Sequence, residues 1–393
     1  MKTSYPVQWL FGLFSLFFPL FSGLNRQKVV LTSFHCDGYR GNTKVLFEKL
    51  INHTYLKPVW LSRNREIVSH INQYYGEERA FLAHSLRGLR ELATANFILF
   101  THGTSDFPFL KLPSRALKIQ TYHGLPTKRG EYMRPKTDNR PNFILRLIFW
   151  YRFRSINYFL SSSPHVKRIF SERFSIPRQN FLETGFPCYD ELIKGEPDNT
   201  LVTKAWPDAP EYEKIILYAP TFRKLKKTKW FPFGDYNPEN FAAFLESNKY
   251  LLLLRAHPNE KLDISKFRRY SNRIIDASQH IVENIYDLML LTDLIVTDYS
   301  SIFIEGVLID IPSLFLPYDL DTYERGLSFN YKELVPGAIV NSQKQFLEEI
   351  QYSLHDINRN REKHEKLKNL FYSCTDGQST ERVIDFLEKN LIR

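Results

Sequence analysis

The sequence predicts an α/β protein with two domains, each built on a parallel β-sheet. Short apolar runs alternate with segments of helical spacing along the 393 residues, and this alternation is typical of βαβ units. Several of the apolar runs lead directly into His, Arg, Lys or Ser. The chain is also longer than an ordinary single domain, so we expect two domains.

The composition is that of a folded protein with an anionic partner. Hydrophobic residues make up 43% and charged residues 24% of the chain, which argues against disorder. The formal net charge of +10 favours nucleic acid, a lipid surface or a phosphorylated substrate as the partner. Cys36, Cys188 and Cys374 lie far apart and form no C-x-x-C pair. We therefore expect neither a disulfide framework nor a zinc site, and a reducing compartment fits best.

Residues 7–24 form an uncharged segment rich in Phe and Leu, with Lys2 and Arg26 on its two sides. At about 18 residues, it is at the lower limit for crossing a bilayer, and Gly12 and Pro19 weaken a straight helix. A membrane-surface or re-entrant anchor is the preferred interpretation, with a true span and a helix buried in the fold as alternatives. A signal peptide stays open as well.

The first domain is predicted from strands that alternate with helices. Residues 29–34 have the pattern of a buried strand, and the loop 35–42 leads into an amphipathic helix over 43–52. Further strands are expected at 59–61 and 97–100. These segments are therefore predicted to form a parallel sheet.

Three strand-like runs end in polar loops, at 119–122, 251–254 and 294–296. The residues that follow these runs supply cations, imidazoles and hydroxyls: His123, Lys128, Arg255, His257, Ser300 and Ser301. A helix that starts at Ser300 or Ser301 would also direct backbone N–H groups at a bound anion. Because ligands bind at the carboxyl ends of parallel strands, we predict one anion site from these three junctions.

Residues 128–154 are strongly basic and contain several aromatic side chains near their end. Eight Lys or Arg residues stand against only Glu131 and Asp138. Such a mixture suits an anionic lipid interface, stacking on single-stranded nucleic acid, or a solvated helix that buries one aromatic side. The apolar N-terminus favours the membrane among these three.

An acidic, proline-bearing linker is expected before the second domain, which would begin at Lys214 with a strand over 215–218. Arg223 lies at the end of this strand, whereas the lysines that follow are typical of a solvated loop. The expected organisation has five parts. They are an apolar membrane-associating segment (1–27), a first domain (28–193), a linker (194–213), a second domain (214–375) and a C-terminal helix (376–393).

Four motifs follow one another along the chain. They are His123-Gly124-x-Pro126-x-Lys128, residues 218–223, Arg255-x-His257-Pro258, and residues 297–301. As an ordered set they resemble the CDP-glycerol glycerophosphotransferases that build teichoic acids and related capsules. The likeness continues to Asp376-Gly377 and includes the loop 38–42, so it covers nearly the whole chain.

The resemblance implies a GT-B-like fold, in which two Rossmann-like domains face each other across a cleft. It also implies that the C-terminal domain holds the nucleotide donor and that the N-terminal domain faces a lipid-linked acceptor. Such enzymes are peripheral proteins of the cytoplasmic membrane face and need no catalytic metal. With 393 residues, the chain is closer in size to the primase branch of the family than to its longer polymerases.

The chain departs from the family pattern in two places. Tyr122 stands where the family often has Trp, and the order Leu125-Pro126-Thr127 replaces Thr-Pro-Leu. The run Gly185-Phe186-Pro187-Cys188 ends in Cys where the family often has Arg. The acceptor and the alditol of the donor are therefore left open by the resemblance.

The reaction that the resemblance implies is attack of an acceptor hydroxyl on the β-phosphorus of CDP-glycerol, which transfers glycerol phosphate and releases CMP. CDP-glycerol is the donor substrate, and neither a cofactor nor a metal is expected. His123 is the candidate base, because imidazole titrates near neutral pH, and His257 is expected to stabilise the leaving phosphate. The other expected site residues are Arg255, Ser300, Ser301 and Arg223 for the donor phosphates, Glu305 for the ribose, and Lys128 and Gly124 on the acceptor side. This mechanism requires His123 and His257 to converge on one diphosphate.

Three other functions stay open. The first two are a CDP-ribitol-dependent ribitolphosphotransferase and a nucleotide-sugar glycosyltransferase of the same architecture. The third is a basic nucleic-acid or lipid-binding protein with a degenerate site, which explains the polar residues at the strand ends poorly. We therefore expect CDP-glycerol, a lipid-linked acceptor and an anionic membrane surface as partners, and no nucleic acid.

Overall fold

The computed structural model describes residues 5–18, 22–127, 147, 153–223, 227–323, 327–356 and 358–391. The described chain divides into two compact units. The N-terminal unit contains the described residues of 1–125, 132–190 and 372–393, and the C-terminal unit contains those of 126–131 and 191–371. The segment expected as a linker, 194–213, lies inside the C-terminal unit and includes the short helix α8 (Leu201–Ala205).

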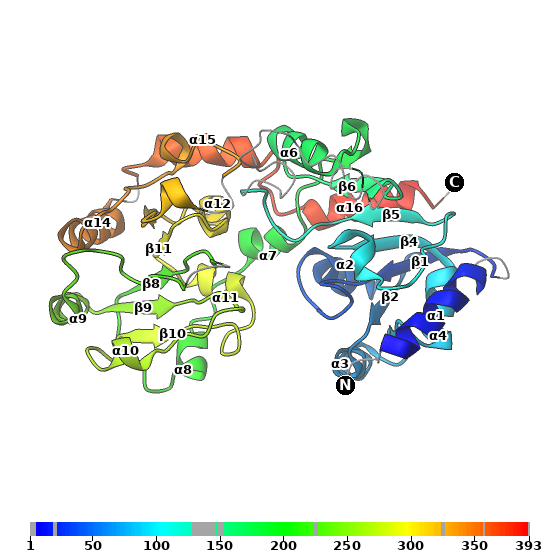
Figure 1. Cartoon of the computed structure of the whole chain (residues 1–393), viewed down its shortest axis with the longest axis horizontal. Coiled ribbons are helices and arrows are strands. Elements are labelled where there is room, and N and C mark those ends of the chain that lie inside the picture. The colour runs from blue at the N-terminus through cyan, green and yellow to red at the C-terminus, as the bar shows by residue number, and fades with distance from the viewer. Residues whose placement is uncertain are drawn as a thin grey trace. The chain divides into compact units, whose positions relative to one another are not determined.

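A seven-stranded parallel sheet forms the centre of the N-terminal unit (Figure 1). Its strand order is β3-β2-β1-β4-β5-β6-β7. The middle strands are nearly continuous apolar runs with buried side chains, as expected for a parallel sheet that is covered on both faces. The strands are β1 (Asn25–Leu31), β2 (Lys57–Ser62), β3 (Ala80–Leu82), β4 (Ala95–Phe100), β5 (Leu117–Gln120), β6 (Tyr158–Leu160) and β7 (Phe181–Leu182).

Polar side chains start the helices that connect these strands. Ser163 caps α6 by accepting a hydrogen bond from the backbone N–H of Val166. Asp190 accepts from the backbone N–H groups of Ser379 and Thr380 at the start of α16, which packs against α2 in the N-terminal unit (Figure 1). The helices described in this unit are α1 (Tyr5–Phe17), α2 (Asn42–Leu50), α3 (Arg65–Tyr75), α4 (Leu86–Ala93), η2 (Gly103–Asp106), α6 (Pro164–Phe174), η4 (Arg178–Asn180) and α16 (Ser379–Lys389), and α7 (Cys188–Lys194) leads into the C-terminal unit.

The C-terminal unit has a five-stranded parallel sheet of order β10-β9-β8-β11-β12. Its core joins Ile216, Leu252 and Val296 from the strands to Phe241 and Phe346 from helices α9 and α14. The elements are β8 (Lys214–Tyr218), α9 (Pro238–Ser247), β9 (Tyr250–Leu254), α10 (Ser265–Arg268), β10 (Ile274–Asp276), α11 (Ile285–Leu290), β11 (Leu294–Thr297), α12 (Ile302–Gly306), η5 (Val307–Ile309), β12 (Ser313–Phe315), η6 (Leu320–Thr322), α13 (Tyr331–Leu334), α14 (Gln343–His355) and α15 (Arg361–Phe371).

The prediction of an α/β fold with parallel sheets is confirmed. Two strands end earlier than the apolar pattern predicts, at Leu31 and at Gln120. The reason is local backbone conformation: the three residues 34–36 have φ angles of 47°, 60° and 65°, and Tyr122 has a φ of 60°. Left-handed backbone cannot continue a strand, so these residues turn out of the sheet at its carboxyl edge.

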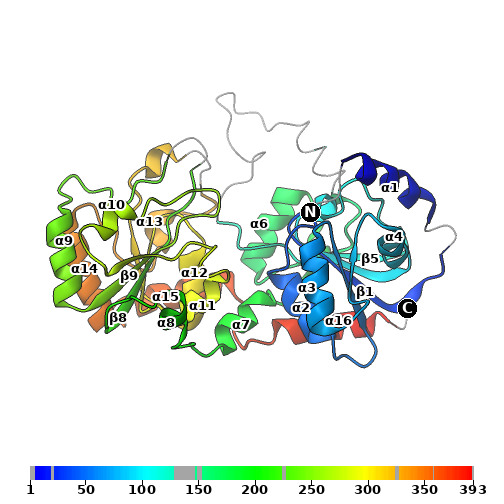
Figure 2. The ribbon, with the colours of Figure 1, turned by 90° about the horizontal axis from the view of Figure 1, so that it is seen from below.

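Helix α1 contacts its own unit through small and polar residues and exposes apolar ones. Gln8 and Ser15 are buried, and the Ser15 hydroxyl accepts from the backbone N–H of Lys111 at 2.8 Å. A Cβ atom at Gly12 would lie 2.7 Å from the carbonyl oxygen of Phe109, so only Gly allows this close approach. The opposite face exposes a run of large side chains: Tyr5, Trp9, Leu10, Leu13, Phe14, Leu16 and Phe17. Figure 2 shows α1 lying beside α4.

No helix in the described part of the chain is long and apolar enough to cross a membrane.

Candidate active site

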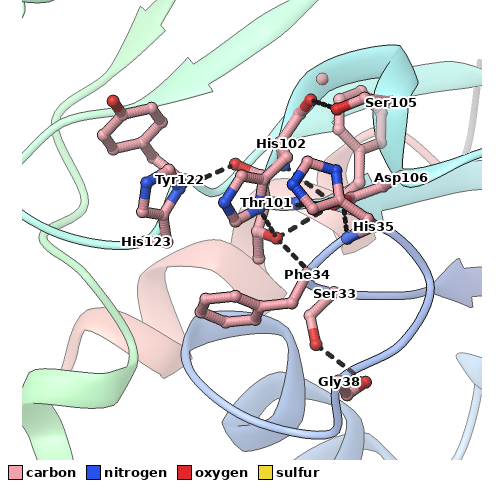
Figure 3. Close-up of polar contacts among 12 residues, drawn as sticks. Ser33, Phe34, His35, Gly38, Thr101, His102, Ser105, Asp106, Tyr122 and His123 are labelled. Atoms are coloured by element: carbon pink, nitrogen blue, oxygen red, sulfur yellow. Dashed lines mark hydrogen bonds and ion pairs between the residues drawn. The ribbon is translucent and has the colours of Figure 1, made fainter. Parts of the chain in front are cut away.

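Three loops meet at the carboxyl edge of the N-terminal sheet (Figure 3). They follow β1, β4 and β5, which are neighbours in the sheet, and they carry His35, His102 and His123. Figure 3 shows the three imidazole rings gathered in one cluster with Phe34 and Tyr122. The ring centroids of His102 and His123 are 3.9 Å apart, and those of His35 and His102 are 4.5 Å apart.

The buried carboxylate of Asp106 fixes two of these loops. It accepts hydrogen bonds from the backbone N–H groups of His35 at 2.5 Å, Thr101 at 2.6 Å and His102 at 2.8 Å. Burial raises the pKa of Asp106, and these N–H donors act in the opposite direction. The left-handed residues 34–36 are unfavourable by themselves, so these bonds are what hold the loop in place.

Two buried amide side chains connect the end of β5 and the third loop to neighbouring parts of the unit. Asn42 donates to the carbonyl oxygens of Thr121 and Tyr122, and its own oxygen accepts from the N–H of Cys188. Gln120 donates to the carbonyl of Thr101 and accepts from the N–H of Gly103. The strand ends around His123 are therefore tied together by side chains from α2 and β5.

His123 is held as the tautomer of a proton acceptor. Its Nδ1 lies 3.4 Å from the carbonyl oxygen of Thr101, and because a carbonyl can only accept, Nδ1 carries the hydrogen and Nε2 carries the lone pair. The ring stacks on His102 at an interplanar angle of 3° and on Tyr122 at 29°, and the residue as a whole is exposed. Burial lowers the pKa of His123 below its ordinary value, and the positive charges of His35, Arg173 and Arg40 add to this effect. The imidazole is therefore neutral at pH 7.

His257 in the C-terminal unit has the opposite tautomer. Its Nδ1 accepts from the backbone N–H of Asn259 at 3.1 Å, so the hydrogen of the neutral ring is on Nε2. The ring is exposed and stacks on Phe222 with centroids 5.0 Å apart. An Nε2–H group can donate to an anion, which is the role expected for this residue.

The two arginines beside these strand ends are bound to protein groups. Arg223 is only 4% exposed, and its guanidinium donates to both carboxylate oxygens of Asp319, to Asp298 and to the carbonyl of Thr221. Arg255 donates to the carbonyl oxygens of Ala277, Val282 and Glu283. Burial lowers the pKa of Arg255 to about 10, so it stays charged at neutral pH.

Asp298, which is buried, and Asp319, which is partly exposed, form a network with Arg223 beside the serine loop. Asp298 accepts from the backbone N–H groups of Thr221 and Tyr299, at 2.8 and 2.5 Å. Burial acts to raise the pKa of Asp319, but the Arg223 guanidinium outweighs burial and holds this pKa below its ordinary value. The network joins the ends of β8 and β11 to the segment after β12.

Ser300 and Ser301 follow β11 and are partly exposed. Ser301 donates to Glu305 Oε1 at 3.2 Å, and Glu305 is 8% exposed rather than solvated. Helix α12 has only five residues and continues into the 3₁₀ turn η5. The ends of β9 and β11 lie on the two sides of β8 at one sheet edge, so the loops of His257 and Ser300 share that edge.

Of the two residues expected on the acceptor side, the structure describes Gly124 but not Lys128. Gly124 has a φ of 152°, and a Cβ atom there would have open space around it. Lys128 and most of the basic segment 128–154 lie outside the described residues.

Sequence reasoning missed several residues that build the site, namely Asn42, His102, Asp106 and Asp319. Two of these were within reach, because His102 and Asp106 follow the strand predicted at 97–100. The rule that polar residues gather at strand ends would have found them there. In the described part of the chain, no group of three or more His, Cys, Asp or Glu residues could hold a metal ion.

Two α/β units with parallel sheets, and with imidazole and hydroxyl groups at their strand ends, are typical of GT-B-like transferases. The family model described as CDP-glycerol:poly(glycerophosphate) glycerophosphotransferase matches residues 13–389. The chain belongs to this family and is therefore a transferase of teichoic acid biosynthesis that uses a CDP-alditol donor.

Curated relatives include enzymes for two alditols. The chain is 28% identical to a teichoic acid glycerol-phosphate transferase of Staphylococcus aureus, over 95% of this chain and 96% of the relative. It is 27% identical to a teichoic acid ribitol-phosphate primase of Bacillus spizizenii, over 97% and 96%. Among solved structures, the wall teichoic acid polymerase TagF superposes with a TM-score of 0.78 at 22% identity, covering 99% of both chains. This structural match supports the GT-B-like fold.

Proposed function

We propose that this enzyme transfers glycerol phosphate from CDP-glycerol to a hydroxyl group of a lipid-linked acceptor and releases CMP. The observation that carries the proposal is the contact of His123 Nδ1 with the carbonyl oxygen of Thr101, from which we assign a tautomer that leaves Nε2 able to accept a proton. In this reaction the acceptor oxygen bonds to the β-phosphorus and the P–O bond to CMP breaks. The hydroxyl proton passes to Nε2 of His123.

The C-terminal unit would hold the donor. The Nε2–H of His257 donates to the diphosphate and stabilises the charge that develops on CMP. The hydroxyls of Ser300 and Ser301 bind the same phosphates, and Glu305, oriented by Ser301, accepts from the ribose hydroxyls. The convergence of these groups with His123 on one diphosphate stays a prediction.

We propose that Arg223 and Arg255 do not bind the substrate directly and instead hold the segments next to the donor site. Arg223 supports the serine loop, because both of its carboxylate partners bind backbone or side chains of that loop. Arg255 fixes the segment 277–283 next to the strand that ends before His257. Lys128 and Gly124 are proposed to lie on the acceptor side.

Mass spectrometry of the products tests this function. The enzyme is given CDP-glycerol and a panel of lipid-linked acceptors, and we expect acceptor masses to rise by whole glycerol phosphate units with one CMP released for each. Release of CMP without any acceptor-bound product would contradict the transfer.

CDP-ribitol is the second candidate donor, because the ribitol-phosphate primase matches this chain at nearly the same identity and coverage as the glycerol-phosphate transferase. Competition between equal amounts of CDP-glycerol and CDP-ribitol decides between them. A ribitol phosphate product in excess would replace the proposed donor and leave the proposed chemistry unchanged.

The exposed face of α1 supports attachment to the cytoplasmic face of the membrane. Trp9 and Phe17 are 61% and 60% exposed, and the helix meets its own unit through its polar side. This arrangement suits a helix that lies in a lipid interface with its aromatic side chains among the headgroups. A large exposed apolar face of this kind usually marks a site of interaction with a membrane or another molecule.

Replacing Trp9, Leu13 and Phe17 together by Gln should weaken sedimentation with anionic phospholipid vesicles at least about tenfold, since each side chain loses its transfer free energy. Tyr74→Gln is the matched control, because Tyr74 is 74% exposed on α3 of the same unit. Equal sedimentation of the triple variant and the control would contradict the anchor.

A further inference from the structure

Thr101 connects the candidate base to a buried carboxylate. Both Thr101 and Asp106 are fully buried. The backbone N–H and the hydroxyl of Thr101 donate to Asp106 Oδ2, at 2.6 and 3.0 Å. The carbonyl oxygen of Thr101 lies 3.4 Å from Nδ1 of His123 and also accepts from Gln120. Figure 3 shows Thr101 among the Asp106, His102 and His123 side chains.

The Thr101 hydroxyl also fixes a hydrogen position on His102. Because the hydroxyl donates its own hydrogen to Asp106, Oγ1 can only accept from its other neighbours. These neighbours are the backbone N–H of Phe34 at 2.9 Å and Nδ1 of His102 at 2.8 Å. Nδ1 of His102 therefore carries a hydrogen, as Nδ1 of His123 does.

The two imidazole rings form a stack whose plane is set through Thr101. Their centroids are 3.9 Å apart and their planes differ by 3°. The hydrogen bond from His123 to the Thr101 carbonyl is long, at 3.4 Å, so it orients the ring only weakly by itself. His102 is held by its shorter contact with the Thr101 hydroxyl and offers His123 a flat surface. The orientation of His123 therefore depends on both contacts of Thr101.

Asp106 holds Thr101 in this position. Its carboxylate also accepts from the backbone N–H groups of His35 and His102. An ionised carboxylate offers only acceptor atoms, which suits these N–H and O–H donors. Nδ1 of His102 is 3.8 Å from Asp106 Oδ1, beyond hydrogen-bond distance, so the carboxylate is linked to this ring through the Thr101 hydroxyl.

We propose that Thr101 and Asp106 are positioning residues for His123. They hold the carbonyl that faces the Nδ1 hydrogen and the His102 ring on which His123 stacks, and thereby keep the lone pair of His123 on Nε2. A neutral imidazole without these contacts would divide between two tautomers and several orientations, and only part of this population could accept the hydroxyl proton. The role rests on the proposed function, in which His123 is the base.

The first test observes the tautomers by ¹⁵N NMR of the full-length protein with labelled histidine. Spectra are recorded at about pH 8, where an ordinary imidazole is neutral, and His102→Gln and His123→Gln assign the two rings. We expect both wild-type rings to carry hydrogen on Nδ1 and none on Nε2. Thr101→Val should give a tautomer mixture at His102, and Thr101→Ser, which keeps the hydroxyl, should restore the wild-type pattern. Asp106→Asn should give mixtures at both rings, because its amide hydrogens would face N–H donors.

Thr380→Val is the matched control. Thr380 is a buried threonine of α16 in the same unit, and its hydroxyl has no hydrogen-bond partner in the described part of the chain. The proposal is wrong if the wild-type rings carry hydrogen on Nε2, or if Thr101→Val and Asp106→Asn give the same spectrum as this control. Should Asp106→Asn fail to fold by circular dichroism, the pair Thr101→Val and Thr101→Ser decides the question.

The second test asks whether this positioning acts through His123. We expect kcat for CMP release to fall about tenfold or more in Thr101→Val and Asp106→Asn, with KM for CDP-glycerol unchanged and with Thr101→Ser close to the wild type. In a His123→Ala background, the same substitutions should not lower the residual rate further, because no base is left to orient. Unchanged kcat in both variants, or an equal further loss in the His123→Ala background, would overturn the positioning role.

The two tests separate this role from the proposed function. If the wild-type enzyme releases no CMP, or if His123→Ala keeps full turnover, the proposed function of His123 fails. The NMR spectra still decide in that case whether Thr101 and Asp106 set the tautomers of the two rings.

Discussion

His123 and His257 each lie beyond the carboxyl end of a parallel strand in their own unit, and they have opposite hydrogen-bonding capacity. Each follows a parallel strand and stacks on an aromatic neighbour, Tyr122 in one unit and Phe222 in the other. The backbone group that faces Nδ1 differs: it is a carbonyl oxygen for His123 and an N–H for His257. The first ring therefore presents a lone pair at Nε2, and the second presents a hydrogen.

The loops around the two histidines are also held by different sets of contacts. In the N-terminal unit, Asp106 binds three backbone N–H groups and thereby shapes the loops beside His123. In the C-terminal unit, Asp298 binds two backbone N–H groups and also the guanidinium of Arg223. A carboxylate organises a strand-end loop in both units, and in the second one a buried ion pair is part of the support.

The largest expected effect is that of His123→Ala. Loss of a general base should lower kcat about 1,000-fold or more, and His123→Gln should not restore activity, because an amide oxygen is a very weak base. CMP release is measured with CDP-glycerol and acceptor, and circular dichroism confirms that the variants are folded. Turnover near that of the wild type in either variant would remove His123 from the reaction.

His257→Ala should lower kcat about 100-fold, as the loss of one donor to a developing charge does. His257→Gln should recover part of this loss, since its amide N–H can donate to the diphosphate. The contrast between Gln at the two positions directly tests the tautomer assignment. If Gln rescues at 123 and fails at 257, the two roles are exchanged.

Arg223→Gln should destabilise the protein by about 3–5 kcal/mol, because it leaves Asp298 and Asp319 without the guanidinium that both carboxylates bind. Urea unfolding followed by tryptophan fluorescence measures this change, and Arg223→Lys, which keeps the charge without the planar fork, should lie between. A loss below about 1 kcal/mol together with a raised KM for CDP-glycerol would make Arg223 a phosphate ligand, as its strand-end position predicts.

The parts of the fold that follow from local patterns were predictable. Continuous apolar runs predicted the strands that correspond to β1, β2, β4, β5, β8, β9 and β11, but not the short strands β3, β7, β10 and β12. The residues after three of those runs include His123, His257, Ser300 and Ser301. The places where strands stop were less predictable, because the left-handed residues 34–36 carry no glycine and depend on a carboxylate about 70 positions away.

The directions of the side chains were not predictable from the sequence. Arg223 and Arg255 both follow strands, yet their guanidinium groups turn to Asp319 and to the backbone of 277–283 rather than outward. The tautomer of His123 was not predictable for the same reason, because Thr101 and His123 belong to different strand ends that only the folded sheet brings together. Position along a strand identifies candidates, and tertiary contacts assign their chemistry.

The smallest expected effect is on the pH dependence of kcat/KM, and it tests His123 as the base without any substitution. The base must be neutral to act, and the pKa of His123 is lowered by burial and by the charges of His35, Arg173 and Arg40. Activity should therefore persist as the pH falls through about 6.5, the ordinary value for imidazole, and decline only as the pH falls through the lower pKa of His123. The profile is measured at constant ionic strength, because screening weakens the effect of the arginines. Half-loss at or above about pH 6.5 would contradict His123 as the base, because the pKa of His123 is lowered.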